Sequence, residues 1–135
     1  MDWKACQRSG LVKTIKVDSN LIKSLVKESA KKLRTQNQIL LSDESASSKI
    51  TLAYDAVRMV LEAVAIKHGF KIYNHECYKA FLKEVMREST LGDEFDKFRK
   101  IRNAINYYGK EVLAVGSENI IKRLIKFHRK IRGFL

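Results

Sequence analysis

The residues best suited to binding chemistry lie between Phe98 and Gly109, in the stretch FRKIRNAINYYG. At about 100° per residue on a helix, the arginines and asparagines of this stretch fall on one side. Guanidinium and amide groups donate hydrogen bonds to phosphate oxygens and to the polar edges of bases. The pattern therefore predicts a helix face that binds the phosphate of RNA or of a nucleotide. Its residues are Arg99, Arg102, Asn103 and Asn106.

The opposite side of this helix is apolar and accounts for its folding, with Phe98, Ile101, Ile105 and Tyr108 spaced three, four and three residues apart. A solvated surface is the simpler interpretation of the polar side. Such a surface usually carries lysine and glutamate, however, and asparagine lowers the stability of a helix interior. The two asparagines therefore favour the binding interpretation.

Cleavage of RNA is the alternative chemistry. Without a metal, it needs a group that removes the proton of the 2′-hydroxyl and a cation that stabilises charge on the phosphate. Arg102 can supply the cation, and Tyr107 or His75 is the candidate base. An unperturbed tyrosine, with a pKa near 10, is a weaker base at neutral pH than an imidazole, with a pKa near 6.5. On a regular helix, moreover, Arg102 and Tyr107 point about 140° apart, so we expect them to meet only through a kink or across a dimer. We therefore rank binding above cleavage.

His75 stands at the start of a predicted helix, where the helix dipole should lower its pKa and keep the ring neutral. A structural role, such as packing on Tyr78, is the simpler interpretation of this histidine. His68 and Cys77 complete no recognised metal-ligand spacing, so we expect neither a metal nor a cofactor.

A second polar group interrupts an otherwise apolar helix. Asp55, Arg58 and Glu62 follow one another at spacings of three and four residues, so they share one stripe of that helix. Acid and base can pair along such a stripe. We interpret the three residues as a supporting polar stripe rather than as a site.

The charge of the chain points to an anionic partner. Its 27 Lys and Arg residues against 15 Asp and Glu residues give a formal net charge of +12, and a positive field of this size attracts phosphate-bearing molecules.

Cys6 and Cys77 are too few for a disulfide framework, so we predict two free thiols in a reducing cytoplasm. No apolar stretch resembles a signal peptide or a membrane span, so no membrane association is expected.

The 135 residues predict a single all-α domain, an up-and-down bundle of four to five helices behind an N-terminal arm of residues 1–17. Residues 42–49 have turn composition. The helix after them is apolar over more than half of its circumference, which predicts a central position in the bundle. We expect one helix over residues 21–41 and a second over residues 50–68, which Gly69 ends. A third helix begins at a cap formed by Asn74, and a fourth begins at Asp93 after a break at Gly92; Gly109 is expected to interrupt or kink this fourth helix. The last helix runs over residues 118–132.

Two segments carry a resemblance to a known family. GFKIYNHE, from Gly69, and FRKIRN followed by Tyr107, Tyr108 and Gly109 resemble the HEPN superfamily of small α-helical proteins. The tract from Tyr54 to Glu62 resembles the second helix of that family. The resemblance implies an up-and-down bundle that forms a homodimer and is commonly encoded beside a minimal nucleotidyltransferase in toxin–antitoxin pairs. In many members it implies a metal-independent ribonuclease.

The catalytic motif of that family is an arginine, four to six residues and a histidine, with a polar residue directly after the arginine. Arg102 and Asn103 match its first half, Tyr107 stands where histidine is commonest, and no histidine follows before His128. Three expectations stay open: RNA or nucleotide binding, a ribonuclease that uses Arg102 with Tyr107 or His75, and a partner of a nucleotidyltransferase. In the third, the tyrosine pair is a contact or an acceptor for nucleotidylation.

Overall fold

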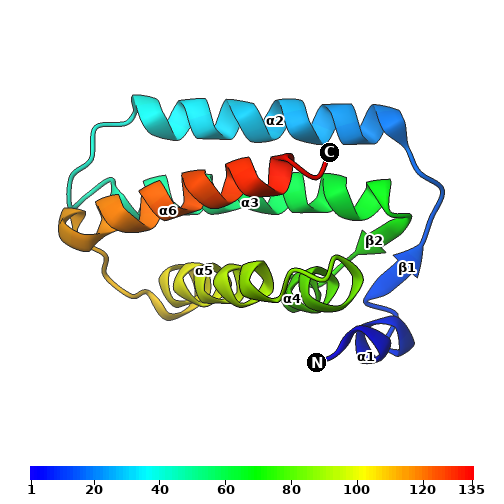
Figure 1. Ribbon diagram of the computed structural model, residues 1–135. Coiled ribbons are helices and arrows are strands. Elements are labelled where there is room, and N and C mark those ends of the chain that lie inside the picture. The colour runs from blue at the N-terminus through cyan, green and yellow to red at the C-terminus, as the bar shows by residue number, and fades with distance from the viewer.

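A computed structural model describes all residues, 1–135, as a bundle of helices with one small sheet (Figure 1). In chain order the elements are α1 (Trp3–Arg8), β1 (Val12–Thr14), α2 (Ser19–Gln38), α3 (Ala46–Lys67), β2 (Phe70–Ile72), α4 (Glu76–Ala80), a π-helical turn η1 (Phe81–Val85), α5 (Ser89–Tyr108) and α6 (Ala114–Arg132). No helix is long and apolar enough to cross a membrane.

Four long helices alternate in direction along the chain and form the bundle. Figure 1 shows α2 and α5 running one way and α3 and α6 the other. Helix α3 packs against α2, α5 and α6, and more than half of its residues are buried. The structure thus confirms the all-α, up-and-down bundle and the central position of the helix after residue 49. The core is one cluster that takes residues from every long helix except α2, whose Leu33 packs against it.

Two helix starts agree with the cap residues predicted from the sequence. The Asp18 carboxylate accepts a hydrogen bond from the backbone N–H of Leu21 (3.0 Å), and the Asn74 side chain accepts one from that of Glu76 (2.8 Å). Helix α3, however, begins at Ala46, inside the segment predicted as a turn. There the buried ammonium group of Lys49 donates to the backbone oxygen of Ile39 (2.6 Å), which ties this first turn to the end of α2.

The predicted break at Gly92 is wrong, because α5 begins three residues earlier, at Ser89, and Gly92 lies buried within its first turn. A Cβ atom at position 92 would lie 2.5 Å from Cγ of Lys83 and 3.1 Å from the backbone oxygen of Lys79. The glycine therefore allows α5 to approach the preceding helical segment closely, and it does not end a helix.

Gly109 ends α5 instead of kinking it. Its φ angle of 61° is left-handed, which glycine adopts without strain, and the helix stops at Tyr108. The placement of Tyr108 on the apolar face is wrong, since its side chain is 83% exposed. As the last residue of α5, Tyr108 lies beyond the helices that cover Phe98. Helix α6 has non-helical backbone at Val115 and Gly116, so its regular part begins at Ser117, close to the predicted start.

The N-terminal arm packs on the bundle through a helix and a strand. Trp3 of α1 is buried against Phe70 and Phe81. Strand β1 pairs antiparallel with β2, with Val12 opposite Ile72. The sequence predicted the arm but not this sheet, because strands of three residues are too short to show an alternating pattern.

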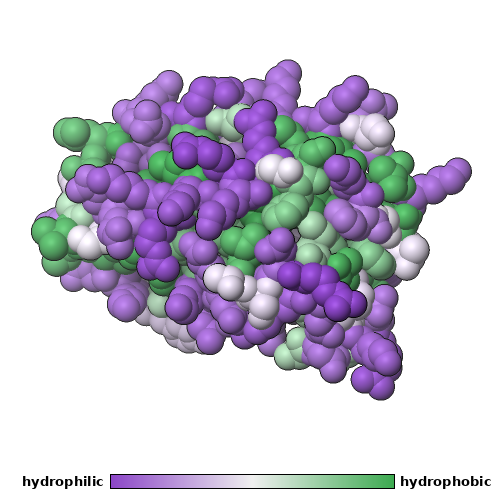
Figure 2. Space-filling view, in the orientation of Figure 1, coloured by the Kyte–Doolittle hydropathy of each residue, from purple (hydrophilic) through white to green (hydrophobic).

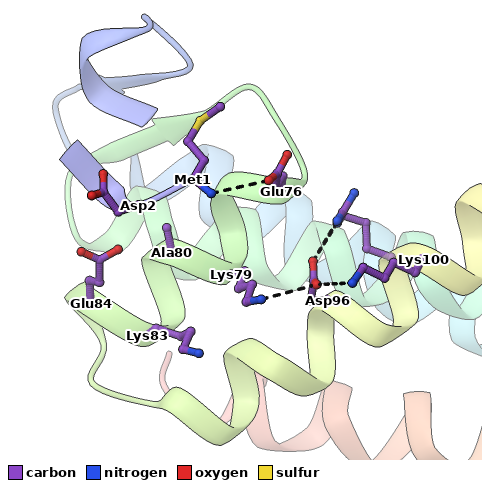
Figure 3. A pocket seen from close by; sticks show the side chains of 10 residues that line it. Met1, Asp2, Glu76, Lys79, Ala80, Lys83, Glu84, Asp96 and Lys100 are labelled. Carbon is purple, nitrogen blue, oxygen red and sulfur yellow. Dashed lines mark hydrogen bonds and ion pairs between the residues drawn. The ribbon is translucent and has the colours of Figure 1, made fainter. Parts of the chain in front are cut away.

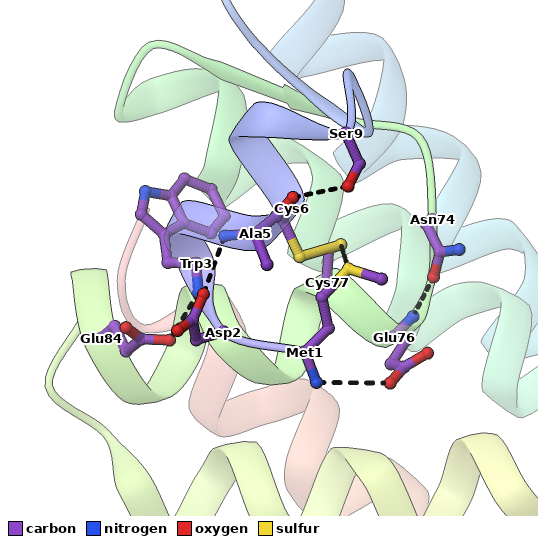
Figure 4. Close-up of a disulfide and its surroundings, with 10 residues drawn as sticks. All are labelled: Met1, Asp2, Trp3, Ala5, Cys6, Ser9, Asn74, Glu76, Cys77 and Glu84. Atoms are coloured by element: carbon purple, nitrogen blue, oxygen red, sulfur yellow. Dashed lines mark hydrogen bonds and ion pairs between the residues drawn. A yellow bond between two sulfur atoms is a disulfide. The ribbon is translucent and has the colours of Figure 1, made fainter.

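Cys6 and Cys77 form a disulfide, so the prediction of two free thiols is wrong (Figure 4). Folding brings their Cα atoms to 6.1 Å although 71 positions separate them in sequence. The argument for a reducing cytoplasm, which rested on free thiols, loses its basis. The bond joins α1 to α4 and so fixes the arm beside the segment that leads into α4.

An aromatic cluster joins α3, α4, α5 and α6. Phe95 of α5 lies at its centre, with ring centroids 5.8 Å from Tyr54, 5.9 Å from Tyr78 and 6.3 Å from Phe127. Large buried aromatic surfaces contribute strongly to core stability. The cluster therefore gives the polar residues on the outer side of α5 a rigid base.

Candidate phosphate-binding pocket

The polar face of α5 lies opposite the segment that connects β2 to α4, and an open pocket of about 350 Å³ separates them. We call it the Arg102 pocket. The β1–β2 pairing and the disulfide hold one wall, and the aromatic cluster supports the other. Its lining residues are Tyr73, Asn74, His75, Glu76, Arg99, Arg102, Asn103 and Tyr107.

Arg102 is the one cation of this pocket that forms no ion pair. Its guanidinium Nη1 donates to the side-chain oxygen of Asn103 (3.3 Å) and to the hydroxyl of Tyr107 (3.2 Å), and its buried Nε has no partner. The central carbon of the guanidinium also lies 5.5 Å from the ring centroid of Tyr54 and 5.4 Å from that of Tyr107. Aromatic rings within this range attract a guanidinium and help to orient it. Arg102 is thus a positioned positive charge without a counter-charge.

The charge of Arg99 is largely compensated. Its guanidinium Nε donates to one oxygen of Asp96 at 3.0 Å, and Nη2 forms an ion pair with the same oxygen at 2.9 Å. Asp96 is buried and also faces Lys100 and Lys79, at 3.3 and 3.6 Å. Burial alone would raise the pKa of Asp96, but the bond and charge of Arg99 and the contact with Lys100 outweigh it and lower that pKa. Arg99 therefore contributes less free charge to the Arg102 pocket than the sequence suggested.

A second pocket, of about 540 Å³, adjoins the first through Arg99 and Glu76 (Figure 3). Figure 3 shows Asp96 between Lys79 and Lys100, and the amino group of Met1 toward Glu76, at 3.7 Å. Acidic and basic side chains alternate around it, so its cations have partners in the chain. It supplies no concentrated positive charge, in contrast to the pocket at Arg102.

His75 enters the Arg102 pocket at the position before α4 and shares a hydrogen bond of 2.9 Å between its Nδ1 and the hydroxyl of Tyr54. The Tyr54 side chain is fully buried, and His75 is the only hydrogen-bond partner of its hydroxyl. A buried hydroxyl without an acceptor is costly, so we assign Tyr54 as the donor and Nδ1 as the acceptor. The remaining ring proton of the neutral imidazole then lies on Nε2. His75 thus offers a donor on the side of its ring away from Tyr54, and not a base.

Burial, together with the positive charges of Arg58, Arg102 and Arg99, lowers the pKa of His75 to about 4. The expectation of a neutral His75 therefore agrees with its surroundings, although burial and arginine charges are the cause and not the helix dipole. Burial also raises the pKa of Tyr54, so its hydroxyl keeps its proton.

The stability of the protein should fall as the pH decreases from about 6.5 to 4. His75 and His128, whose pKa burial also lowers to about 4, stay neutral in the fold while the unfolded chain takes up protons. We expect each to contribute on the order of 1 to 2 kcal/mol, allowing for partial solvent exposure. Urea unfolding across this range measures the loss, and His75→Gln and His128→Gln proteins should each show a flatter profile. A wild-type profile that is flat above pH 4 would contradict the burial of both rings.

The structure brings together most of the predicted site residues, because Arg99, Arg102, Asn103, Tyr107 and His75 all line one pocket. The expectation that Arg102 and Tyr107 meet only through a kink or a dimer is wrong. Both lie in the regular part of α5, and their long side chains bridge the angle between their Cα–Cβ directions.

Asn106 is the predicted residue that the pocket leaves out. It is exposed, its side chain makes no hydrogen bond, and it does not line the pocket, although the next residue, Tyr107, does. Sequence reasoning missed Tyr73 and Tyr54 as contributors to the pocket. The placement of Tyr73 directly after β2 depends on a sheet too short to predict, and Tyr54 had looked like ordinary core.

The supporting polar stripe on α3 is formed only in part. Nη1 of Arg58 donates to Glu62 at 2.9 Å, as the spacing predicted, and Lys71 of β2 pairs with the other carboxylate oxygen. Burial alone would raise the pKa of Glu62, but the bonds from Lys71 and Arg58 outweigh it and lower that pKa. Asp55 forms no ion pair, so the third member of the stripe is not engaged. The stripe joins β2 to α3 beneath the pocket wall.

No family model, curated protein or solved structure matches this chain. Function must therefore be argued from the pocket itself.

Proposed function

We propose that this chain binds single-stranded RNA, through one of its phosphates, in the Arg102 pocket. The observation that carries the proposal is the guanidinium of Arg102, which is oriented by Tyr54 and Tyr107 and has no carboxylate partner. An arginine in such a setting provides strong, charge-assisted donors for phosphate oxygens.

The neighbours of Arg102 favour an RNA chain over a free phosphate ion. Two tyrosines of the pocket, Tyr73 and Tyr107, are 57% and 67% exposed. Exposed aromatic rings beside a cation are the usual platform on which unpaired bases stack. Asn103 and the Nε2 proton of His75 add donors and acceptors for base edges or for the 2′-hydroxyl. The net charge of +12 would draw a polyanion to the surface.

The resemblance of Phe98–Asn103 to HEPN proteins extends the proposal. On that basis the chain acts as a homodimer in a toxin–antitoxin or defence-type system, and a minimal nucleotidyltransferase is an alternative protein partner. What supports this extension is the resemblance, together with an up-and-down bundle that presents Arg102 and Asn103 at a pocket.

A metal-independent ribonuclease is the second candidate, and one contact favours it. The hydroxyl of Tyr107, which replaces the usual histidine of the family motif, lies 3.2 Å from Nη1 of Arg102. This contact places beside each other the cation that would stabilise the phosphate and the hydroxyl that would handle the proton. His75 is less suited to act as the base, since Nδ1 is occupied by Tyr54 and Nε2 carries the proton. Binding therefore remains the better-supported function.

Binding of a short, unstructured RNA should weaken about 2- to 3-fold for each phosphate contact as salt rises from about 50 to 200 mM, because each contact releases counterions. Fluorescence anisotropy with labelled RNA measures this dependence. RNA that stacks on Tyr73 and Tyr107 should also bind more tightly than a duplex of the same length, whose bases are not available. An affinity independent of salt, or a preference for the duplex, would refute the proposal.

A further inference from the structure

A groove runs between α2 and α6, away from the Arg102 pocket, and its chemistry differs from that of the pocket. Two adjoining cavities of about 280 and 470 Å³, which share Arg132, form it. We call it the α2–α6 groove. Its apolar lining residues are Ile22, Val26, Ala30 and Leu33 of α2, Ile125 of α6 and the terminal Leu135.

The floor of the groove is aliphatic and incompletely covered. Ile22, Val26 and Leu33 are each only partly buried, and their spacing of four, four and three residues through Ala30 makes one continuous ridge along α2. The face of the molecule that carries α2 and α6 shows green apolar patches between purple polar side chains (Figure 2).

The rim of the groove is entirely basic. Lys23, Lys27 and Arg34 come from α2, and Arg129 and Arg132 come from α6. All five side chains belong to exposed residues, none forms an ion pair, and no acidic residue lines either cavity. The acids of these helices that do form ion pairs, Glu28 and Glu118, are engaged by Lys31 and Lys122. The groove thus combines an apolar floor with an uncompensated positive rim.

We propose that the α2–α6 groove is a docking site for an acidic amphipathic helix of a partner protein. An apolar floor receives the apolar face of such a helix, as in other helix-in-groove complexes, and the basic rim pairs with its acidic flanks. From Ile22 to Arg34 the groove extends about 18 Å, the length of about three helical turns. The proposal is independent of the Arg102 pocket.

Other polyanions fit the groove less well. It contains no aromatic ring on which a base could stack and, apart from His128, no neutral polar side chain to read a base edge. A lipid surface is flat and is met by protruding apolar side chains, whereas here the apolar residues lie on the floor of a hollow. An acidic helix satisfies both the shape and the charge.

The test uses a labelled designed peptide of about three to four turns, with leucines at helical spacing and glutamates on both flanks. It should bind the protein, and Arg129→Glu/Arg132→Glu should weaken binding at least about tenfold. This charge-reversed protein should instead bind a peptide that carries lysine on the flank facing α6 and keeps glutamate on the flank facing α2. The matched control, Lys4→Glu/Arg8→Glu on α1, changes the net charge equally and should leave peptide binding within about twofold of the wild type.

A second variant tests the floor without changing charge. Val26→Gln should weaken binding of the acidic peptide severalfold while the circular dichroism spectrum stays that of the wild type. A scrambled peptide without an apolar face that bound equally well would overturn the proposal, as would the absence of binding by the designed peptide. The proposal would also be overturned if a short RNA displaced the peptide from the wild type and no longer bound the Arg129→Glu/Arg132→Glu protein. The groove would then be a nucleic-acid surface.

Discussion

An Arg102→Ala protein is expected to bind single-stranded RNA about 10- to 100-fold more weakly than the wild type, since a charge-assisted hydrogen bond contributes about 1.5 to 3 kcal/mol. Arg102 is the cation of the pocket without an ion pair, so its loss removes charge that nothing nearby replaces. The dependence of affinity on salt should decrease by the equivalent of about one phosphate contact. Fluorescence anisotropy at several salt concentrations measures both effects.

Two further variants separate the role of Arg102 from general charge. Arg102→Lys keeps the charge but loses the planar guanidinium, so it should bind RNA with intermediate affinity. Arg8→Ala removes an exposed arginine of α1 outside the pocket and should leave affinity nearly unchanged. Equal losses in Arg102→Ala and Arg8→Ala would mean that RNA binds through diffuse charge and not in the pocket.

The same proteins distinguish binding from cleavage. RNA incubated with the wild type and a metal chelator should remain intact if binding is the function. If the wild type cleaves the RNA and neither Arg102→Ala nor Tyr107→Phe does, the protein is instead a ribonuclease in which Tyr107 takes part in proton transfer.

Reduction of the Cys6–Cys77 disulfide is expected to lower the free energy of unfolding by about 4 kcal/mol, the chain-entropy value for a loop of this length. The bond closes a loop over a sequence separation of 71 residues, which includes α2 and α3. Loss of the cross-link increases the conformational freedom of the unfolded chain. Urea unfolding with and without a reductant measures the difference.

A Cys6→Ser/Cys77→Ser protein is the control for this prediction. It should have the lower stability in both conditions and no response to the reductant. If the wild type lost no stability on reduction, the arm would be held by Trp3 and the β1–β2 pairing alone. If the wild type contained two titratable thiols before reduction, the disulfide itself would be refuted.

Fold class was predictable because it depends on local patterns. The apolar spacing in α3 exceeded one helix face, which placed that helix at the centre, and Asp18 and Asn74 marked helix starts through their side-chain oxygens. Gly92 was misread because glycine has two roles. At Gly109 a left-handed backbone ends a helix, whereas at Gly92 the missing Cβ allows two segments to touch, and only the neighbouring Lys79 and Lys83 distinguish these cases.

Only one wall of the candidate site, the polar face of α5, was predictable from the sequence. Helical periodicity placed Arg99, Arg102 and Asn103 on one face of α5, but the opposite wall depends on a sheet of three-residue strands and on a disulfide. The sequence also could not show which of Arg99 and Arg102 keeps a positive charge without an acidic partner. Asp96 lies three residues before Arg99, and only the structure shows that it is buried and pairs with that arginine.

The sequence by itself indicated the four long helices, their order and the side chains whose chemistry suits phosphate, because these follow from spacing and side-chain chemistry along the chain. Only the tertiary structure decided which of those residues act together. It joined Cys6 to Cys77, placed His75 against Tyr54 and left Arg102 without a counter-charge. It also aligned the basic residues of α2 and α6 along one groove. Ion pairing, burial and contact between distant segments depend on distances in space, which periodicity along a chain does not contain.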